Sequence, residues 1–223
     1  FSAEDVVQAA IAIADAEGLA GLSMRRGAEA MRISPMAIYT YVPSKAELVD
    51  LMFDRVLGAT ADPDDSVVGW RARLAFAARQ RWALVERHPW FLDLALHRPP
   101  LGPNVLRKAD VVLSALDGMG LEPDEVMLVG QALQNYVTGA QQAARDARDA
   151  ERETGRTDAQ WIELVRPALE AHMDPEAYPA LARRKVMGPP GRAASMAERT
   201  AHFEFGLERM LDGLEAYIER RGR

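Results

Sequence analysis

The chain has 223 residues, of which 48% are hydrophobic and 27% charged, and this apolar content is enough to bury a core in one or two domains. The absence of cysteine excludes a disulfide framework, a thiolate zinc site and a cysteine nucleophile. A formal net charge of -6 argues against a protein that coats nucleic acid over its whole surface, but it leaves a local basic patch open.

Helical periodicity dominates almost every window of the chain, and strict alternation of the kind found in strands is missing. Ser2 is expected to cap the first helix, and Gly18 to end it. Ser44 and Glu47 form a capping box that predicts the start of a later helix. We place the first four helices at residues 2–18, 23–31, 35–42 and 44–57.

A polar segment without an apolar face, residues 58–69, is the expected linker between two domains. Residues 1–57 would form the first domain and residues 70–223 the second. Helices of the second domain are predicted at residues 70–87, 104–118, 123–153 and 161–171, in a short piece of 174–192, and from Ser195 to the end. The expected fold is therefore all-α throughout.

Two short helices joined by a three-residue turn, with helices before and after, predict a helix-turn-helix, which places its second helix in the DNA major groove. Ala28 provides the small side chain needed where the helices cross, and Ile38 is one of the apolar residues that hold them together. Candidate base contacts are Ser34, Pro35, Met36, Ala37, Thr40 and Tyr41. Candidate phosphate contacts are Ser23, Arg25, Arg26, Arg32, Tyr39, Ser44 and Lys45.

Residues 22–26 and 38–48 read LSMRR and IYTYVPSKAEL, and they resemble the DNA-binding domain of the tetracycline-repressor (TetR) family. The resemblance covers residues 2–57 and implies that Tyr39 and Lys45 bind phosphates while the third helix reads bases. Arg32 stands where the family usually has a glycine, so we expect a left-handed or distorted turn there, at a cost of ~1 kcal/mol. Gly27 also departs from the family pattern, which usually has a branched apolar residue at this position.

Charge is the evidence against this interpretation. Residues 1–57 carry five basic and eight acidic side chains, whereas DNA-binding modules are usually more basic. Four of the five bases cluster near the predicted turn, and Glu4, Asp5, Asp15 and Glu17 lie on the first helix. A generic helical hairpin remains the alternative.

The second domain resembles, more weakly, the ligand-binding domain of the tetracycline repressors, on residues 96–97, 121–125 and 136–140. The resemblance implies that His97 lies where those proteins help to hold the magnesium of the drug complex. Because Arg98 and two prolines follow and no threonine does, we expect neither a magnesium–tetracycline ligand nor a bound metal. An ordinary loop histidine is the alternative.

A ligand sensor needs an apolar cavity with a few polar groups. Candidate walls are Trp82, Trp90, Phe91, Leu94, Leu113, Leu116, Met127, Trp161 and Leu164. Candidate polar groups are Gln131, Gln134, Asn135, Tyr136 and Thr138. Trp82 and Leu113 also suit an ordinary core, and Gln131 and Gln134 also suit a solvated face. Asn135 and Thr138 are expected to be buried and to need partners.

Binding two half-sites about one helical turn apart requires a two-fold dimer. The last helix is apolar over too wide an arc to pack on one side only, so with the end of the long central helix it predicts a homodimer interface. Its apolar residues include Phe203, Phe205, Leu207, Met210, Leu211 and Leu214.

The leading hypothesis is a cytoplasmic repressor, released from a double-stranded operator by a small, largely apolar effector. A regulator gated by a protein partner is the alternative. An enzyme is not expected, because the four histidines are dispersed and there is no phosphate loop or nucleophile elbow. No cofactor is expected. No stretch approaches the ~18 apolar residues of a membrane span, and the first residues are acidic where a signal peptide is basic.

Overall fold

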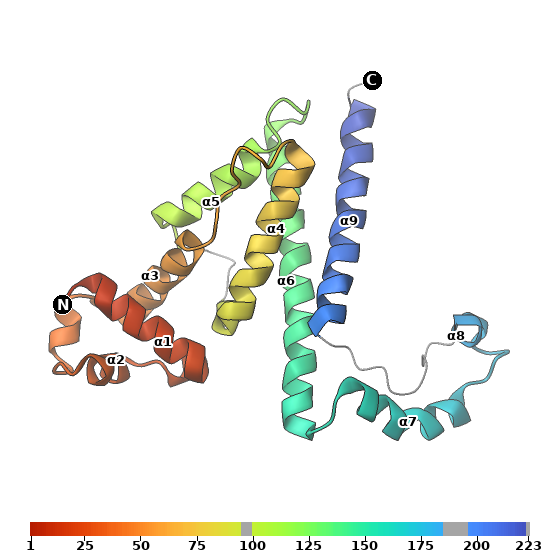
Figure 1. Cartoon of the computed structure of the whole chain (residues 1–223), viewed down its shortest axis with the longest axis horizontal. Helices are drawn as coiled ribbons and strands as arrows, with labels where there is room; N and C mark the ends of the chain where they lie inside the picture. The colour runs from red at the N-terminus through yellow and green to blue at the C-terminus, as the bar shows by residue number, and fades with distance from the viewer. Residues whose placement is uncertain (95–99, 185–195, 222–223) are drawn as a thin grey trace. The chain divides into compact units, whose positions relative to one another are not determined.

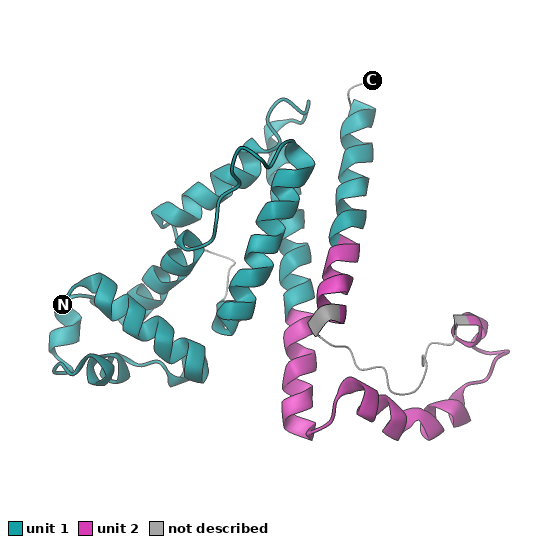
Figure 2. Cartoon of the chain, viewed as in Figure 1, with its two compact units in different colours: residues 1–141, 207–223 teal, residues 142–206 magenta. Residues whose placement is uncertain are grey.

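The computed structural model describes residues 1–94, 100–184 and 196–221, and every regular element within these ranges is a helix (Figure 1). The prediction of an all-helical fold is confirmed. The chain divides into two compact units, residues 1–141 with 207–223 and residues 142–206 (Figure 2). The predicted linker at 58–69 lies inside the larger unit.

The first helices begin where side-chain caps predict. In α1 (Ala3–Gly21), Ser2 Oγ accepts from the Asp5 N–H at 3.2 Å, and the Asp5 carboxylate accepts from the Ser2 N–H at 2.7 Å. The helix continues past its expected end because Gly18, at φ 72°, kinks it without stopping it. The helices α2 (Met24–Met31) and α3 (Lys45–Gly58) are capped by Ser23 and Ser44.

The predicted third helix is much shorter than expected. Only a 3-10 turn, η1 (Ala37–Thr40), forms between α2 and α3. The Ala37 and Tyr41 N–H groups donate to the carbonyls of Ser34 and Ile38 at 2.9 and 3.0 Å, three residues back. The tight turn follows because Pro43 ends a segment too short to gain more than a few helical bonds.

The predicted helices at 70–87 and 123–153 match the structure closely, whereas the helix predicted at 104–118 ends at Ser114. The larger unit also has a 3-10 turn at 89–93 that was not predicted. It holds α4 (Trp70–Arg87), η2 (Pro89–Asp93), α5 (Pro103–Ser114), and parts of α6 (Pro123–Thr154) and α9 (Met196–Arg221). In the smaller unit lie α7 (Asp158–His172) and α8 (Pro179–Arg184). The helix α7 starts before Trp161 because Thr157 and Gln160 form a capping box. The capping residue expected at Ser195 lies outside the described residues.

One apolar core joins the first three helices to η2 and α4. Its most buried side chains are Val6, Ala10, Leu22, Ala28, Ile38, Val42, Leu48, Met52, Trp90 and Phe91. The Asp15 carboxylate accepts from the Trp90 indole N–H at 2.7 Å and lies 2.7 Å from His88 Nδ1. Within the larger unit, η2 is therefore docked on α1 by apolar burial and by one shared carboxylate.

Candidate nucleic-acid interface and ligand cavity

Small residues on α2 let the turn η1 approach closely. Ala28 is fully buried, and a Cβ added at Gly27 would lie 3.0 Å from Ile38 Cδ1. Ile38 is itself fully buried, and side chains near it face outward: Met36, just before η1, is 77% exposed, and Tyr39 in η1 is 45% exposed. Gly27 is thus the residue that seats the turn, which explains its departure from a branched side chain.

The left-handed conformation expected at Arg32 is confirmed, at φ 56° and ψ 39°. It is the one described non-glycine residue with a positive φ. The Arg32 N–H donates to the carbonyl of Glu29 at 3.1 Å and closes α2. Its side chain is exposed beside the reading turn.

Three exposed hydroxyls flank the turn, and each already accepts one hydrogen bond. Ser23, Ser34 and Ser44 Oγ accept from backbone N–H groups at 3.1–3.2 Å. Each hydroxyl keeps a proton that it can donate, which suits a phosphate oxygen. The hydrogen bonds of these three serines order the local backbone, and they also hold each hydroxyl in one orientation.

Two of the cationic side chains near the turn form ion pairs with glutamates. Arg25 Nε lies 2.8 Å from Glu29 Oε1, and Arg26 pairs with Glu17. Lys45 Nζ donates to the Leu19 carbonyl at 3.5 Å. Glu17, assigned to the first helix and away from the bases, therefore lies against one of them.

The remaining candidate DNA contacts differ in exposure. Pro35 and Thr40 are exposed, and Ala37 is half-buried. Tyr41 is half-buried and packs against the core, because it follows buried Ile38 by one helical turn. Tyr41 is thus only partly available to a base.

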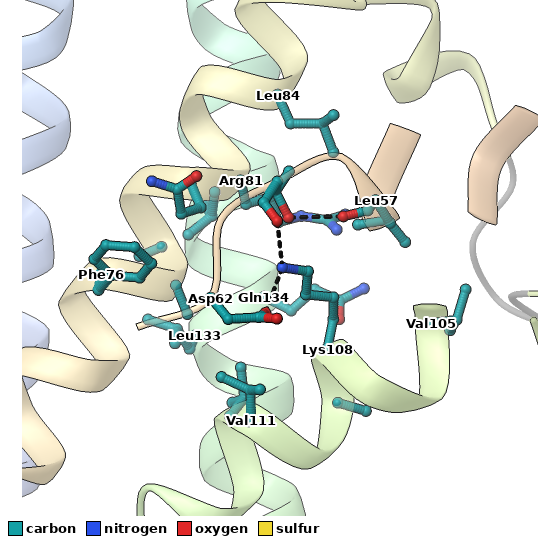
Figure 3. A pocket seen from close by; sticks show the side chains of 18 of the residues that line it. Leu57, Asp62, Phe76, Arg81, Leu84, Val105, Lys108, Val111, Leu133 and Gln134 are labelled. Carbon is teal, nitrogen blue, oxygen red and sulfur yellow. Dashed lines mark hydrogen bonds and ion pairs between the residues drawn. The ribbon is translucent and has the colours of Figure 1, made fainter. Parts of the chain in front are cut away.

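A cavity of about 360 Å³ lies among α3, α4, α5, α6 and the segment 60–63 (Figure 3). Its walls are mainly apolar side chains, among them Phe53, Leu57, Phe76, Leu84, Val105, Val111, Val112, Leu113, Leu133 and Val137. Its polar lining includes Thr60, Asp62, Gln80, Arg81, Lys108, Gln131 and Gln134. All of these residues belong to the larger unit.

Lys108 closes one side of the cavity with all its donors engaged. Its ammonium donates to the carbonyls of Thr60 and Ala61 at 2.7 and 3.0 Å, and to Asp62 Oδ1 at 2.6 Å. Asp62 also pairs with Arg107. Burial, with some repulsion from Arg107, lowers the pKa of Lys108 to about 8. The segment 60–62 is therefore held to α5 by a polar cluster.

Arg81 is the second cation of the cavity, and it is not satisfied. Its Nε and Nη2 are shielded from solvent and have no hydrogen-bond partner within the described ranges. The guanidinium lies 5.0 Å from the centroid of the Phe91 ring, which stacks on Phe53 at 4.6 Å. Burial lowers the pKa of Arg81 to about 10.

Four of the predicted ligand residues line this cavity: Leu113, Met127, Gln131 and Gln134. Other predicted residues do not line it and lie in the core, namely Trp82, Trp90, Phe91 and Leu116, which are buried, and Leu94, which is half-buried. His97 lies outside the described residues.

The expectation of a buried Asn135 is wrong: the side chain is exposed and accepts from Gln131 Nε2 at 2.8 Å. Thr138 and Tyr136 are half-buried. Trp161 and Leu164, in the smaller unit, are 49% and 58% exposed. Helical spacing identifies an apolar stripe, but neighbouring residues on its edge turn toward or away from it by small rotations.

The sequence interpretation missed Arg81 and Lys108, although both carried a signal. Arg81 follows Leu74 and Ala78 at core spacing on α4, and Lys108 lies between Val105 and Val112 in the same way on α5. A cation within an apolar stripe indicates a buried charge that needs a partner or a function.

Two further classes of site were sought. In the described ranges, no three histidine or acidic side chains are grouped as a metal site would require. Likewise, none of the described helices is long and apolar enough to cross a membrane.

Comparison with known proteins gives consistent similarities. Residues 62–218 match the family described as the tetracyclin repressor-like, C-terminal domain. The chain is 42% identical to the HTH-type transcriptional repressor DrrR1 of Streptomyces coeruleorubidus, over 97% of this chain and 78% of that protein. It is 32% identical to an HTH-type transcriptional regulator of Saccharopolyspora erythraea, over 96% of this chain and 84% of that protein.

Solved structures show the same arrangement. The TetR family protein ActR of Streptomyces coelicolor, in complex with actinorhodin, superposes with a TM-score of 0.77 at 26% identity over 98% of both chains. Its complex with (S)-DNPA gives a TM-score of 0.75 at 25% identity, over 97% of this chain and 98% of that one.

Proposed function

This chain belongs to the tetracycline-repressor family of transcriptional regulators, and from that premise we propose that it is a dimeric repressor. The dimer holds a palindromic operator until a small, largely apolar effector enters the cavity. Its relatives are named as transcriptional repressors and regulators, and none of the names compared above is that of an enzyme.

The observation that carries this proposal is that one helix serves both sites. The helix α3 begins at Ser44 and Lys45, which suit phosphate contacts, and its last turns contribute Phe53 and Leu57 to the cavity wall. Fourteen residues of helix span roughly 20 Å as a stiff rod. A ligand that displaces the Leu57 end therefore tilts the end that faces DNA.

A second contact couples α3 to the helix that lines the cavity opposite it. Asp54 Oδ1 accepts from the backbone N–H groups of Asn104 and Val105 at 2.9 and 3.0 Å, and Oδ2 accepts from Asn104 Nδ2 at 2.8 Å. The carboxylate thus caps α5, where a negative charge also favours the helix dipole. Close approach at this contact requires Gly58 and Gly102, since a Cβ at either would meet Asn104 or Asp54.

On DNA, we assign the exposed residues of η1 to base edges and the surrounding hydroxyls and cations to phosphates. Arg25 and Arg26 would exchange Glu29 and Glu17 for phosphate oxygens, which limits the net gain at these positions. Thr40 and Met36 are exposed and carry a hydroxyl and an apolar group toward the groove.

The second half of this proposal is the homodimer, formed by the last helix and the long central helix. Phe205 on α9 is 66% exposed in the single chain, whereas Phe203, Leu207 and Leu211 of the same helix are buried within it. An interface along α9 would cover this side chain.

A small-molecule effector is supported by the cavity and by a relative. ActR, similar along its whole length, has been solved with actinorhodin and with (S)-DNPA. The cavity of this chain has the volume and the apolar lining typical of small-molecule sites.

The test is selection of bound duplexes from a random library, read by sequencing at two salt concentrations. We expect an inverted repeat to be enriched, with affinity falling steeply as salt rises. In the same assay, Lys45→Ala should weaken binding to all duplexes, whereas Thr40→Ala should change which bases are preferred. If no duplex is enriched at low salt, the repressor proposal fails.

A further inference from the structure

The Arg81 guanidinium has one edge free in the interior of the protein. Nε and Nη2 are the two nitrogens of that edge, and their N–H groups point in parallel, as the two oxygens of a carboxylate require. Neither atom has a hydrogen-bond partner in the part of the chain that the structure describes. The side chain lines the cavity (Figure 3).

This arrangement is costly unless something compensates it. A buried cation without a partner loses its hydration and gains no ion pair in exchange. The only described carboxylate that lines the cavity is Asp62, and it is already shared by Lys108 and Arg107. The charged groups of the lining, Arg81 and Lys108 against Asp62, therefore leave an excess of positive charge.

The guanidinium is also held in place before any ligand binds. It lies over the Phe91 ring of η2, and that ring in turn stacks on Phe53 of α3. At the same residue, the Arg81 carbonyl accepts from Gln141 Nε2 at 2.7 Å. Both donors have almost no accessible surface, so a ligand that binds them has to displace the side chains that cover them.

We propose that the effector is a compact organic acid with an apolar body, whose carboxylate binds the Nε–Nη2 edge of Arg81. The apolar walls contributed by Val105, Val112 and Leu133 would hold the body of the ligand. The inference rests on the proposed role of this cavity as the effector site, and it adds the chemical class of the ligand and the residue that selects it.

The test compares acids with their own amides on the intact protein. The probes are 2-naphthoate, cinnamate and adamantane-1-carboxylate, each titrated beside 2-naphthamide, cinnamamide or adamantane-1-carboxamide by calorimetry. The wild type is expected to bind at least one acid about tenfold more tightly than its amide, because a charge-assisted fork is stronger than a neutral hydrogen bond. If no acid is preferred to its amide, the proposal is overturned.

Variants locate the preference. In Arg81→Met, which keeps the length of the side chain but no charge, the acid and the amide should bind equally. Arg87→Met removes the same charge from an exposed site in the last turn of α4 and should keep the wild-type preference. Arg81→Lys keeps the charge without the fork and should lie between them. A preference unchanged in Arg81→Met would overturn the proposal.

Folding and function are read separately. Thermal unfolding of Arg81→Met should show a Tm no lower than that of the wild type, because an unpaired buried charge is removed. If this variant does not fold, Arg81→Gln replaces it, with the same expected loss of acid preference. Duplex selection on the same proteins keeps the two proposals apart. Operator binding without acid preference would overturn this inference alone, and acid preference without operator binding would overturn the repressor proposal alone.

Discussion

The helices of residues 2–57 and the helices around the cavity use their apolar residues differently. In the first region Ala28, Ile38, Val42, Leu48 and Met52 have no measurable exposure. In the second, no residue of α5 is fully buried, a cavity of about 360 Å³ remains, and a cation is left unpaired. Close packing holds the candidate DNA contacts at fixed distances from one another. Loose packing leaves a space in which a bound ligand can add stabilising contacts and so favour one conformation.

The helix α3 belongs to both regions. Leu48 and Met52 anchor it in the close-packed core, and Phe53 and Leu57 face the cavity. A change in the second region is therefore transmitted through a helix whose other end cannot repack freely.

The largest effect should come from a cavity made in the close-packed region. Met52→Ala is expected to lower the free energy of unfolding by about 3 kcal/mol. Val112→Ala, which enlarges a space that already exists, should cost about 1 kcal/mol or less. Urea unfolding of both variants checks the contrast, with exposed Leu51→Ala as the control on the same helix. Equal losses at residues 52 and 112 would show that the two regions are packed alike.

The next effect tests the contact between the regions. Asp54→Ala removes the cap of α5 and should lower the free energy of unfolding by roughly 1–2 kcal/mol. It should also weaken the effect of an effector on operator release, since α3 and α5 lose their polar link. Exposed Asp50→Ala, one turn earlier on α3, is the matched control. An Asp54 variant with wild-type stability and release would mean that the contact carries no coupling.

A smaller effect is expected at Arg32, the residue in the left-handed conformation, and it concerns both stability and operator binding. Arg32→Gly should stabilise the protein by up to ~1 kcal/mol, because glycine adopts φ 56° without strain. The same change should weaken operator binding if Arg32 contacts a phosphate. Arg32→Ala keeps the strain and loses the charge, so it should lose affinity without gaining stability. Thermal unfolding and a duplex titration separate the two parts.

The smallest effect concerns the acid that competes with DNA. Glu17→Gln releases Arg26 and should raise operator affinity by roughly threefold at low salt, the size expected of one exposed ion pair. The change should fade at high salt. Asp65→Asn makes the same change in net charge at an exposed site in residues 58–69. This variant therefore measures how much of the gain in operator affinity comes from long-range electrostatics alone. Equal gains in the two variants would argue against an Arg26 phosphate contact.

Much of the helical framework could be predicted because helix ends depend on nearby residues. Ser2, Ser23, Ser44 and Thr157 each bond to an N–H three residues along, a contact that the sequence alone specifies. The caps at Ser2 and Ser44 were predicted, whereas Thr157 was missed, and that placed the start of α7 too late. The length of the third helix was wrong, because the turn seated by Gly27 and Ile38 depends on a contact between helices.

The DNA contacts stay a prediction, and they could be proposed from the sequence because they lie within a short, local motif. The cavity could not be, apart from Leu113, Met127, Gln131 and Gln134. Its lining comes from four helices and a loop, and whether Trp82 or Arg81 faces it depends on a rotation that no local pattern specifies.

The sequence by itself determined most of the helices, the caps at Ser2 and Ser44, the left-handed turn at Arg32 and the family, because these depend on residues close together along the chain. Only the tertiary structure decided that Glu17 meets Arg26, that Asp54 caps α5, and that Arg81 lines a cavity with two shielded nitrogens left without a described partner. Such contacts join residues up to 51 positions apart. Burial and charge pairing arise where helices meet, and that meeting is set by the packing of all of them together.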